Sequence, residues 1–314
     1  MDQAETLRRM RPAMRETGTL KQQIKGIAVA SGKGGVGKTN LVANMALHLA
    51  KRGNRVLIFD ADMGLGNIHI LLGLAPRFNV AHVLTGVKRM RDILIDGPGG
   101  IKILPASTGN KKYSELTAEE RLVLKTEMEV IQNDFDYILF DIGAGISSNV
   151  MFFCSAAQDI LVVATPEPTS FSDAYAIMKV LSRDYKVKSF RLVINSARDR
   201  IEAVNIYKRL VMVADKFQLG VKIDFLGHLS MDVAVPNAVR KQRLFSDLFP
   251  NAEATKNIAS IVDTLVKTAT NAGASTGLTY WGPKAHDIAS EKNPRRSGAS
   301  AFRRGGLRGY VKRG

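Results

Sequence analysis

Ten residues near the start of the chain have the types and spacing of a phosphate-binding loop. The run A-S-G-K-G-G-V-G-K-T at 30–39 satisfies the pattern G-x-x-x-x-G-K-[ST]. In such a loop, backbone N–H groups surround polyphosphate oxygens, the last lysine reaches the β- and γ-phosphates, and the hydroxyl binds Mg²⁺. Glycines let the backbone approach the ligand because they carry no Cβ. The residues that this pattern assigns to nucleotide binding are Gly32, Gly34, Gly35, Val36, Gly37, Lys38, Thr39 and Asn40.

The flanking sequence predicts the strand and the helix that position this loop. Residues 27–30 are typical of a short buried strand, and residues 40–50 have a helical pattern that ends before Gly53. A helix that starts at the loop points its free N–H groups and its positive end at the phosphates. The alternative, a chance glycine-rich turn, would require neither element.

Two carboxylate motifs follow other apolar runs. D-A-D-M-G-L-G-N at 60–67 comes after the run 55–59, and Asp141 and Gly143 come after the run 137–140. The carboxyl ends of parallel strands face the ligand crevice of an α/β sheet. An ordinary carboxylate is a weak base near pKa 4, so its main task beside a polyphosphate would be orientation. A simple turn and an ordinary strand end are the alternatives, which the nearby phosphate loop disfavours.

The wider sequence predicts the sheet that brings these motifs together. From residue 26 to about 268, short apolar runs alternate with helical patterns. The runs mostly lack polar alternation, as expected for strands buried on both faces. This order predicts an α/β fold with a doubly wound, mostly parallel sheet flanked by helices. The predicted strands are 27–30, 55–59, 101–104, 137–140, 159–164, 190–194 and 222–227, and predicted helices include 117–133, 147–157, 170–183, 200–216 and 252–268.

Composition excludes several classes of protein. The chain has 314 residues, of which 45% are hydrophobic, and this suffices for a large core. Cys154 is the single cysteine, so we expect no disulfide framework and no cysteine-bound metal, but a buried structural thiol. No run approaches 18 apolar residues, and the charged amino terminus lacks a signal-peptide pattern. A cytoplasmic protein is therefore expected.

The net charge of +16 is unevenly distributed along the chain. Residues 278–314 contain nine Lys and Arg against two acids, which gives 9 − 2 = +7. Such a segment could bind nucleic acid, anionic lipid or an acidic protein, and a solvated tail is the alternative. Specific DNA binding is not expected, because the arginines are scattered among glycines. We expect three parts: a partner-binding helix and tether at 1–25, the nucleotide domain at 26–270, and a basic, disordered tail at 271–314.

The combined motifs resemble the MinD/ParA family of deviant Walker A ATPases. The loop has an early second lysine, Lys33, which in this family crosses to the phosphates of a partner subunit. The resemblance implies a P-loop NTPase fold of the SIMIBI, MinD-like type, ATP and Mg²⁺ as cofactors, and a homodimer that ATP closes. By the same resemblance, the catalytic residues are Lys33, Lys38, Asp62 and Asp141, and the metal site involves Thr39, Asp60 and Asp141.

The resemblance also gives roles to individual residues. Asp62 matches the carboxylate that positions the attacking water, and the Gly143 N–H matches the sensor of the γ-phosphate. Asn195 matches the asparagine that reads adenine, although a strand-end asparagine that caps a turn is the alternative. The segment 227–236 resembles one that precedes a helix beside the nucleotide.

The first residues resemble a narrower group of this family. D-Q-A-E-T-L-R at 2–8 looks like the D-Q-A-x-x-L-R motif of the flagellar-number regulators, the FlhG/FleN (YlxH) group. In that group the motif forms a helix that docks on the signal-recognition-type GTPase FlhF and stimulates it. The resemblance also implies contacts with flagellar C-ring proteins and a flagellar transcription activator. The partner-binding residues would be Asp2, Gln3, Ala4, Leu7 and Arg8.

Two other branches of the family stay open. One is a ParA-type partition ATPase that binds DNA through basic residues, and the other is a MinD-type septum-placement ATPase. The iron–sulfur branches need paired cysteines, and Cys154 stands alone. MinD-type proteins usually end in an amphipathic membrane helix, whereas residues 303–310 are too rich in glycine for a good helix. Association with the inner membrane or a cell pole is therefore left open.

Overall fold

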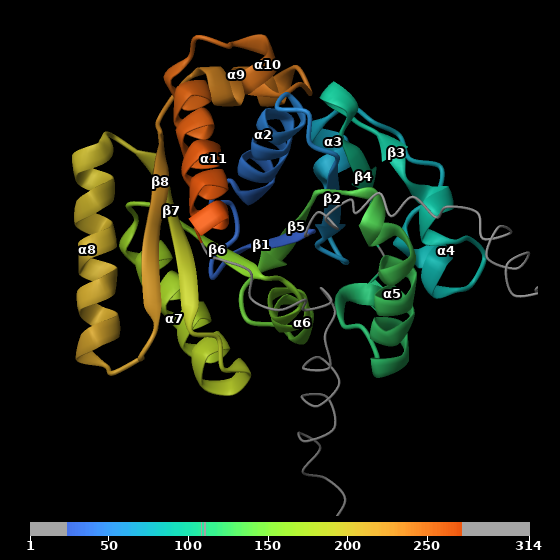
Figure 1. The fold of residues 1–314 in the computed structure, drawn as a ribbon, viewed down its shortest axis with the longest axis horizontal. Helices are drawn as coiled ribbons and strands as arrows, with labels where there is room; N and C mark the ends of the chain where they lie inside the picture. Colours follow the sequence, from blue (N-terminus) through green and yellow to red (C-terminus); the bar gives the residue numbers. More distant parts are fainter. Residues whose placement is uncertain (1–23, 108, 110, 272–314) are drawn as a thin grey trace, which may run out of the picture.

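A mostly parallel sheet with helices on both faces runs through the protein (Figure 1). The computed structural model describes residues 24–107, 109 and 111–271. The segment that carries the predicted partner-binding motif and the basic tail from residue 272 lie outside the described residues. The strands are β1 (Lys25–Ser31), β2 (Val56–Ala61), β3 (Ile95–Asp96), β4 (Lys102–Leu104), β5 (Tyr137–Ala144), β6 (Asp159–Ala164), β7 (Ser189–Ala197) and β8 (Lys222–Ser230).

The strand order in the described sheet is β3-β4-β2-β5-β1-β6-β7-β8, and only the edge strand β3 is antiparallel. The predicted fold class is therefore confirmed. The described α-helices are α2 (Lys38–Ala50), α3 (Ile68–Leu71), α4 (Val80–Leu84), α5 (Ala118–Ile131), α6 (Ser148–Ala156), α7 (Pro168–Tyr185), α8 (Arg200–Lys216), α9 (Ala234–Arg240), α10 (Phe245–Leu248) and α11 (Glu253–Asn271).

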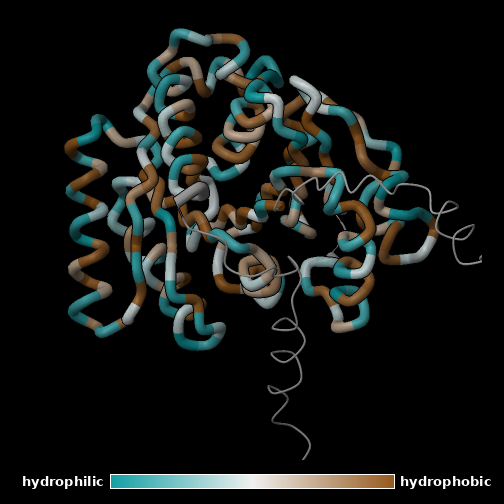
Figure 2. Tube along the Cα trace, viewed as in Figure 1, coloured by the Kyte–Doolittle hydropathy of each residue, from teal (hydrophilic) through white to brown (hydrophobic). Residues whose placement is uncertain are grey.

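The core consists of two apolar layers, one on each face of the sheet. In β1, Ile27 and Val29 join the layer under α2 and α11, whereas Ala28 joins the layer under α6 and α7. Successive strand residues point to opposite faces, so a strand buried on both sides is apolar throughout. Figure 2 shows this as largely hydrophobic strands at the centre of the molecule. The central strands were predictable for this reason.

The prediction that Cys154 is a buried structural thiol is confirmed. Cys154 on α6 is fully buried, and burial raises the pKa of its thiol to about 12. The apolar stripe of α11 packs into the core, since Ile258, Ile261, Val262 and Leu265 are at most 1% exposed.

The structure differs from the predicted elements in two respects. First, α3, α4 and β3 were not predicted between β2 and β4, because elements of two to five residues carry no readable periodicity. Second, the predicted strand ends at 140, 194 and 227 are wrong, since β5, β7 and β8 continue for several residues. β5 extends because Ala144 pairs with Ser31 after a register shift, and the Gly145 N–H then donates to the Ser31 carbonyl. Asp141 and Asn195 therefore lie within strands.

Candidate active site

The loop between β1 and α2 is shaped to receive an anion. Gly35 and Gly37 have φ values of 76° and 88°, in the left-handed region that favours glycine. A Cβ added to Gly34 or Gly35 would meet no atom within 4 Å, so this part of the loop faces open space. Gly37 is the N-cap of α2 and supplies no side-chain acceptor to the first turn of the helix. The N–H groups there are left for a phosphate.

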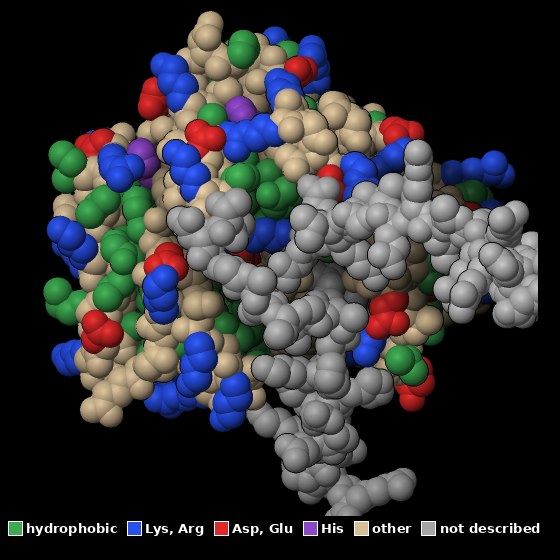
Figure 3. Space-filling model, viewed as in Figure 1, with side chains coloured by type: hydrophobic (Ala, Val, Ile, Leu, Met, Phe, Trp, Pro, Cys, Tyr) green, Lys and Arg blue, Asp and Glu red, His purple; other side chains and the backbone are tan. Residues whose placement is uncertain are grey.

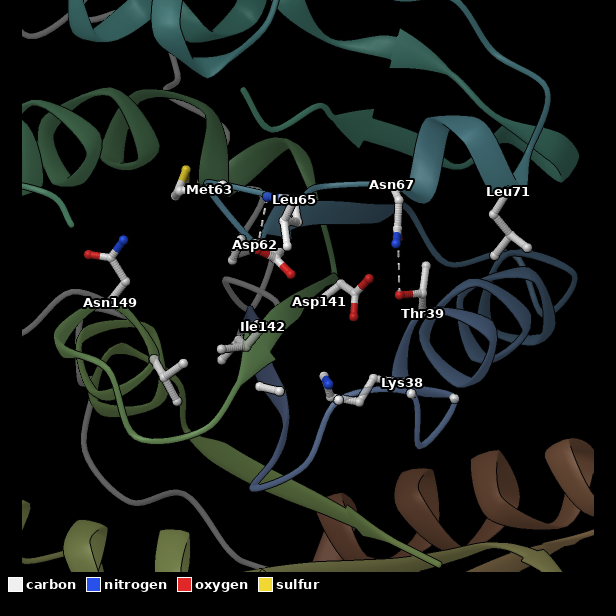
Figure 4. A pocket seen from close by; sticks show the side chains of 18 of the residues that line it. Lys38, Thr39, Asp62, Met63, Leu65, Asn67, Leu71, Asp141, Ile142 and Asn149 are labelled. Atoms are coloured by element: carbon white, nitrogen blue, oxygen red, sulfur yellow. Dashed lines mark hydrogen bonds between the residues drawn. The ribbon is translucent and has the colours of Figure 1, made fainter. Parts of the chain in front are cut away.

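A cavity of about 740 Å³ adjoins the loop and brings the separate motifs together. Figure 4 shows Lys38, Thr39, Asp62 and Asp141 around one opening, although they come from three segments of the chain. The volume lies within the usual range for small-molecule sites. The predicted site residues that line it are Gly34, Gly35, Gly37, Lys38, Thr39, Asn40, Asp62, Asp141 and Gly143.

Lys38 and Asp141 supply the charges deep in the cavity. The Lys38 Nζ donates to Ser31 Oγ at 2.8 Å. Burial lowers the pKa of the Lys38 ammonium, while the Asp141 and Asp62 carboxylates oppose that shift. Burial raises the pKa of Asp141 to about 6, despite a hydrogen bond from the Thr39 hydroxyl and the Lys38 charge. A cation beside Asp141 would favour its ionised form.

The oxygen atoms around Thr39 fit a magnesium ion that also binds phosphates. The Thr39 hydroxyl donates to Asp141, and it lies 3.5 Å from the side-chain amide oxygen of Asn67. Mg²⁺ in nucleotide sites is typically held by one or two carboxylates together with substrate phosphates and waters. Thr39 and Asp141 are therefore the residues that would hold it here.

Asp62, which directly follows β2, lies close to Gly143 near the end of β5. Asp62 Oδ1 accepts a hydrogen bond from the Leu65 N–H at 3.2 Å. A Cβ on Gly143 would lie 3.4 Å from the Asp62 carboxyl carbon. The carboxylate thus sits at the cavity wall, in a position from which it could orient water toward a phosphate. Its catalytic role stays a prediction.

Asp60, a predicted metal residue, is buried and is not among the cavity-lining residues. It pairs in register with Asp141, its Oδ2 accepts from the Ile68 N–H at 3.3 Å, and its Oδ1 has no hydrogen-bond partner among the described residues. Burial and the nearby Asp141 raise the pKa of Asp60 well above its usual value. A Cβ at Gly66 would come within 2.7 Å of Asp60 Oδ2, so the turn needs glycine there. The metal role of Asp60 stays a prediction.

Asn195 contacts the phosphate loop itself. Its Nδ2 donates to the Val36 carbonyl at 2.7 Å, and its Oδ1 accepts from the Ser196 N–H at 2.8 Å. A Cβ at Gly37 would lie 2.3 Å from that Nδ2. The side-chain amide therefore braces the loop in this structure, and neither Asn195 nor Val36 lines the cavity. Adenine reading by Asn195 stays a prediction.

The variant Asn195→Ala separates these two roles. Loss of the hydrogen bond to Val36 is expected to weaken the binding of ATP, GTP and inorganic tripolyphosphate by a similar factor, about three- to tenfold, because all three bind through the loop. Isothermal titration calorimetry measures each affinity. A loss confined to ATP, with tripolyphosphate unchanged, would instead assign Asn195 to the base.

Lys33 and Gly32 lie at the α7 side of the loop. The Lys33 Nζ forms an ion pair with Glu167 and lies 3.2 Å from Thr169 Oγ1, outside the cavity. A Cβ on Gly32 would come 2.2 Å from the backbone oxygen of Asp173, so the loop contacts α7 directly. The structure does not bring Lys33 to the phosphate cavity of its own subunit.

The segment before α9 has a structural carboxylate. Asp232 accepts hydrogen bonds from the N–H groups of Ala234 and Ala254, at 2.8 and 3.1 Å. These bonds lower the pKa of Asp232 and join the starts of α9 and α11. α9 then places Val239 at the cavity, as expected for a helix beside the nucleotide.

Several residues of the cavity wall lie outside every motif. The Asn149 side chain donates to the carbonyls of Tyr113 and Ser114 and accepts from the Leu116 N–H, which fixes one wall. No sequence pattern marks such residues, because only the tertiary fold brings them here. They include Ile70, Leu71, Ser114, Ser147, Asn149 and Val239.

Comparisons with known proteins decide the family. A family model for an AAA domain matches residues 24–192. The antiactivator FleN of Pseudomonas aeruginosa is 40% identical over 253 residues, which cover 80% of this chain and 90% of FleN. The chain belongs to the MinD/ParA-type ATPases, in the FleN/YlxH group. The flagellum site-determining protein YlxH of Helicobacter pylori is 32% identical, over 78% of this chain and 83% of YlxH. Membership makes the chain an enzyme that hydrolyses ATP.

Solved structures agree on the fold. The cell division ATPase MinD of Pyrococcus furiosus superposes with a TM-score of 0.66 at 21% identity, over 78% of this chain and 99% of MinD. The septum site-determining protein MinD of Pyrococcus horikoshii superposes with a TM-score of 0.64 at 19% identity, over 81% of this chain and 100% of that protein. The second of these structures was solved with Mg-ADP bound. Within the residues that the structure describes, no helix combines the length and apolarity needed to cross a bilayer.

Proposed function

We propose that this ATPase is a dimerising switch that regulates the number and placement of flagella. The observation that carries the proposal is the convergence of Lys38, Thr39, Asp62 and Asp141 on one cavity, with Lys33 directed away from it. The flagellar assignment is supported by the similarity to FleN and YlxH.

The proposed cycle assigns a task to each of these residues. Lys38 carries the charge that the β- and γ-phosphates of ATP require, and Thr39 and Asp141 hold Mg²⁺. Lys33 leaves its own subunit and contacts the phosphates of the second one. Asp62 then orients water for hydrolysis. Loss of the γ-phosphate near Gly143 changes the conformation of the segment around this residue and so opens the dimer.

An apolar rim around the cavity supports a second copy of the chain as the partner. Leu65 and Ile70 border the cavity with 73% and 52% of their surfaces exposed, and Ile146, which precedes the lining residue Ser147 in the chain, is 55% exposed. Large exposed apolar side chains that gather around a site mark an interaction surface. Closure of a dimer over the nucleotide would cover them.

The amino-terminal motif supports an FlhF-like GTPase as the second partner. The residues D-Q-A-E-T-L-R at 2–8 precede Pro12, so about two helical turns are available. A helix this short is marginal alone and gains its stability from a partner. Flagellar C-ring proteins and a flagellar transcription activator would be further partners. The protein would act in the cytoplasm, at a cell pole or beside the inner membrane.

A synthetic peptide of residues 1–20 is expected to stimulate the cognate FlhF-like GTPase in a phosphate-release assay. Gln3→Ala combined with Leu7→Ala should remove the stimulation, because the motif loses a polar and an apolar contact. The same double variant in the whole chain should leave ATP hydrolysis unchanged. An inert peptide beside a stimulating whole protein would place the activating surface elsewhere.

The charge of +7 in residues 278–314 favours one competing function, DNA partition. On the face seen in Figure 3, however, the described Lys and Arg side chains are dispersed among acidic and apolar ones. Tight, ATP-dependent DNA binding that is lost when residues 278–314 are removed would support a partition function. The logarithm of its binding constant should then fall with the logarithm of the salt concentration, with a slope of about −0.9 per phosphate contact. We expect weak binding at most.

A further inference from the structure

The ion pair of Lys33 joins the phosphate loop to the first turn of α7. Glu167 is the N-cap of α7, and Thr169 lies in its first turn. The Lys33 ammonium contacts an anionic carboxylate and a neutral hydroxyl, so its charge is paired within its own chain. The charge that a second subunit's phosphates require is therefore already partly neutralised.

The acceptors for Lys33 are held in place by the surrounding backbone. Pro166 and Pro168 flank Glu167, whose φ and ψ of −62° and 134° are those preferred before a proline. The buried Ser170 Oγ accepts from the Thr165 N–H at 2.9 Å and closes this short loop. The flexible Lys33 side chain thus contacts acceptor groups whose positions the backbone already fixes.

The phosphate loop packs closely against α7. Gly32 lies so close to α7 that a Cβ there would come within 2.2 Å of the Asp173 backbone oxygen. Lys33 is the next residue, so its side chain emerges beside the first turn of α7. The contact needs no rearrangement of the chain in the monomer.

Glu167 and a phosphate cannot share this lysine favourably. An ammonium that bridges both would bring a carboxylate close to a polyphosphate, and the two like charges would repel. Lys33 must therefore leave Glu167 to serve a second subunit. Both side chains are substantially exposed, 38% for Lys33 and 62% for Glu167, so the pair is weak and readily released.

We propose that Glu167, assisted by Thr169, is a positioning residue that holds Lys33 in the monomer and competes with the second subunit's phosphates for it. The inference rests on the proposed role of Lys33 across the dimer. An exposed ion pair changes an equilibrium about two- to fivefold. A symmetric dimer releases two such pairs, so the monomer–dimer dissociation constant changes by the square, about 4- to 25-fold. The contact thus sets the protein concentration at which ATP closes the dimer.

The test uses the whole chain with Asp62→Ala, which keeps ATP intact, and follows mass by light scattering across a concentration series with ATP and Mg²⁺. Glu167→Gln is expected to lower the dissociation constant of the dimer about 4- to 25-fold. Thr169→Val should shift it less in the same direction, and Glu167→Asp should stay closer to the parent because the charge is kept. ATP affinity measured below the dimerisation range should not change.

A second measurement reports the contact itself. In nucleotide-free protein, the rate at which acetic anhydride labels Lys33, followed by mass spectrometry, should rise in Glu167→Gln. Labelling of Lys51, an exposed lysine after α2, should stay constant.

Unchanged or weaker dimerisation of Glu167→Gln overturns the inference, since the carboxylate would then be neutral or helpful in the closed dimer. Lys33→Ala in the same background separates this from the proposed function. If Lys33→Ala cannot dimerise and Glu167→Gln behaves as the parent, only the competition is wrong. If Lys33→Ala dimerises as the parent does, the role of Lys33 across the dimer is wrong.

Discussion

Asp62→Ala is expected to lower ATP turnover at least 100-fold and to leave ATP binding nearly unchanged. Asp62 lies at the wall of the cavity, and its Oδ1 is held by the Leu65 N–H. Positioned groups that handle the proton or the water of a reaction contribute about 10²–10⁴-fold to its rate. Binding should persist because the phosphate contacts belong to the loop and to Lys38. Steady-state phosphate release gives the turnover, and a fluorescent ATP analogue gives the affinity.

A matched carboxylate variant controls for loss of negative charge. Asp96 on the edge strand β3 pairs with Lys102 and is remote from the cavity in the fold, with its side chain 80% exposed. Asp96→Ala should hydrolyse ATP at the wild-type rate. If Asp62→Ala also hydrolyses at that rate, the assignment of Asp62 to the water is wrong.

Lys38→Ala is expected to weaken ATP binding about 10- to 100-fold, the second large effect. The ammonium is half-buried beside Asp141, and it would exchange its bond with Ser31 for the phosphates. Hydrogen bonds to charged groups contribute about 1.5–3 kcal/mol each, which corresponds to such a factor. Calorimetric titration with ATP and Mg²⁺ measures the loss.

Lys51→Ala is the control for Lys38→Ala, because Lys51 follows the other end of the same helix and is exposed. Its ATP affinity should match the wild type. If Lys38→Ala binds ATP as tightly as the wild type does, Lys38 does not contact the phosphates.

The central sheet and the core of the site could be predicted because each rests on a local pattern. Strands buried on both faces are continuous apolar runs, so the central strands were located correctly, although β5 and β7 extend beyond their predicted ends. The loop before α2 has glycines where positive φ values are needed, and its spacing alone located Lys38 and Thr39.

The remaining contacts could not be predicted because they depend on residues far apart in the chain. Asn195 meets the Val36 carbonyl from 159 positions away, and Lys33 meets Glu167 from 134 positions away. The burial of Asp60 behind the cavity follows from the turn at Gly66, whose tight packing only the folded structure shows. Short elements such as α3 and α4 likewise depend on local hydrogen bonds and tertiary packing.

In the proposed cycle, ATP closes a homodimer through Lys33. Multi-angle light scattering of Asp62→Ala with ATP and Mg²⁺, compared with Asp62→Ala combined with Lys33→Ala, tests it most directly. Asp62→Ala should rise from the monomer mass of 34.3 kDa to twice that value. The double variant should bind ATP with similar affinity and stay at the monomer mass. If the double variant also doubles its mass with ATP, Lys33 is not the residue through which ATP closes the dimer.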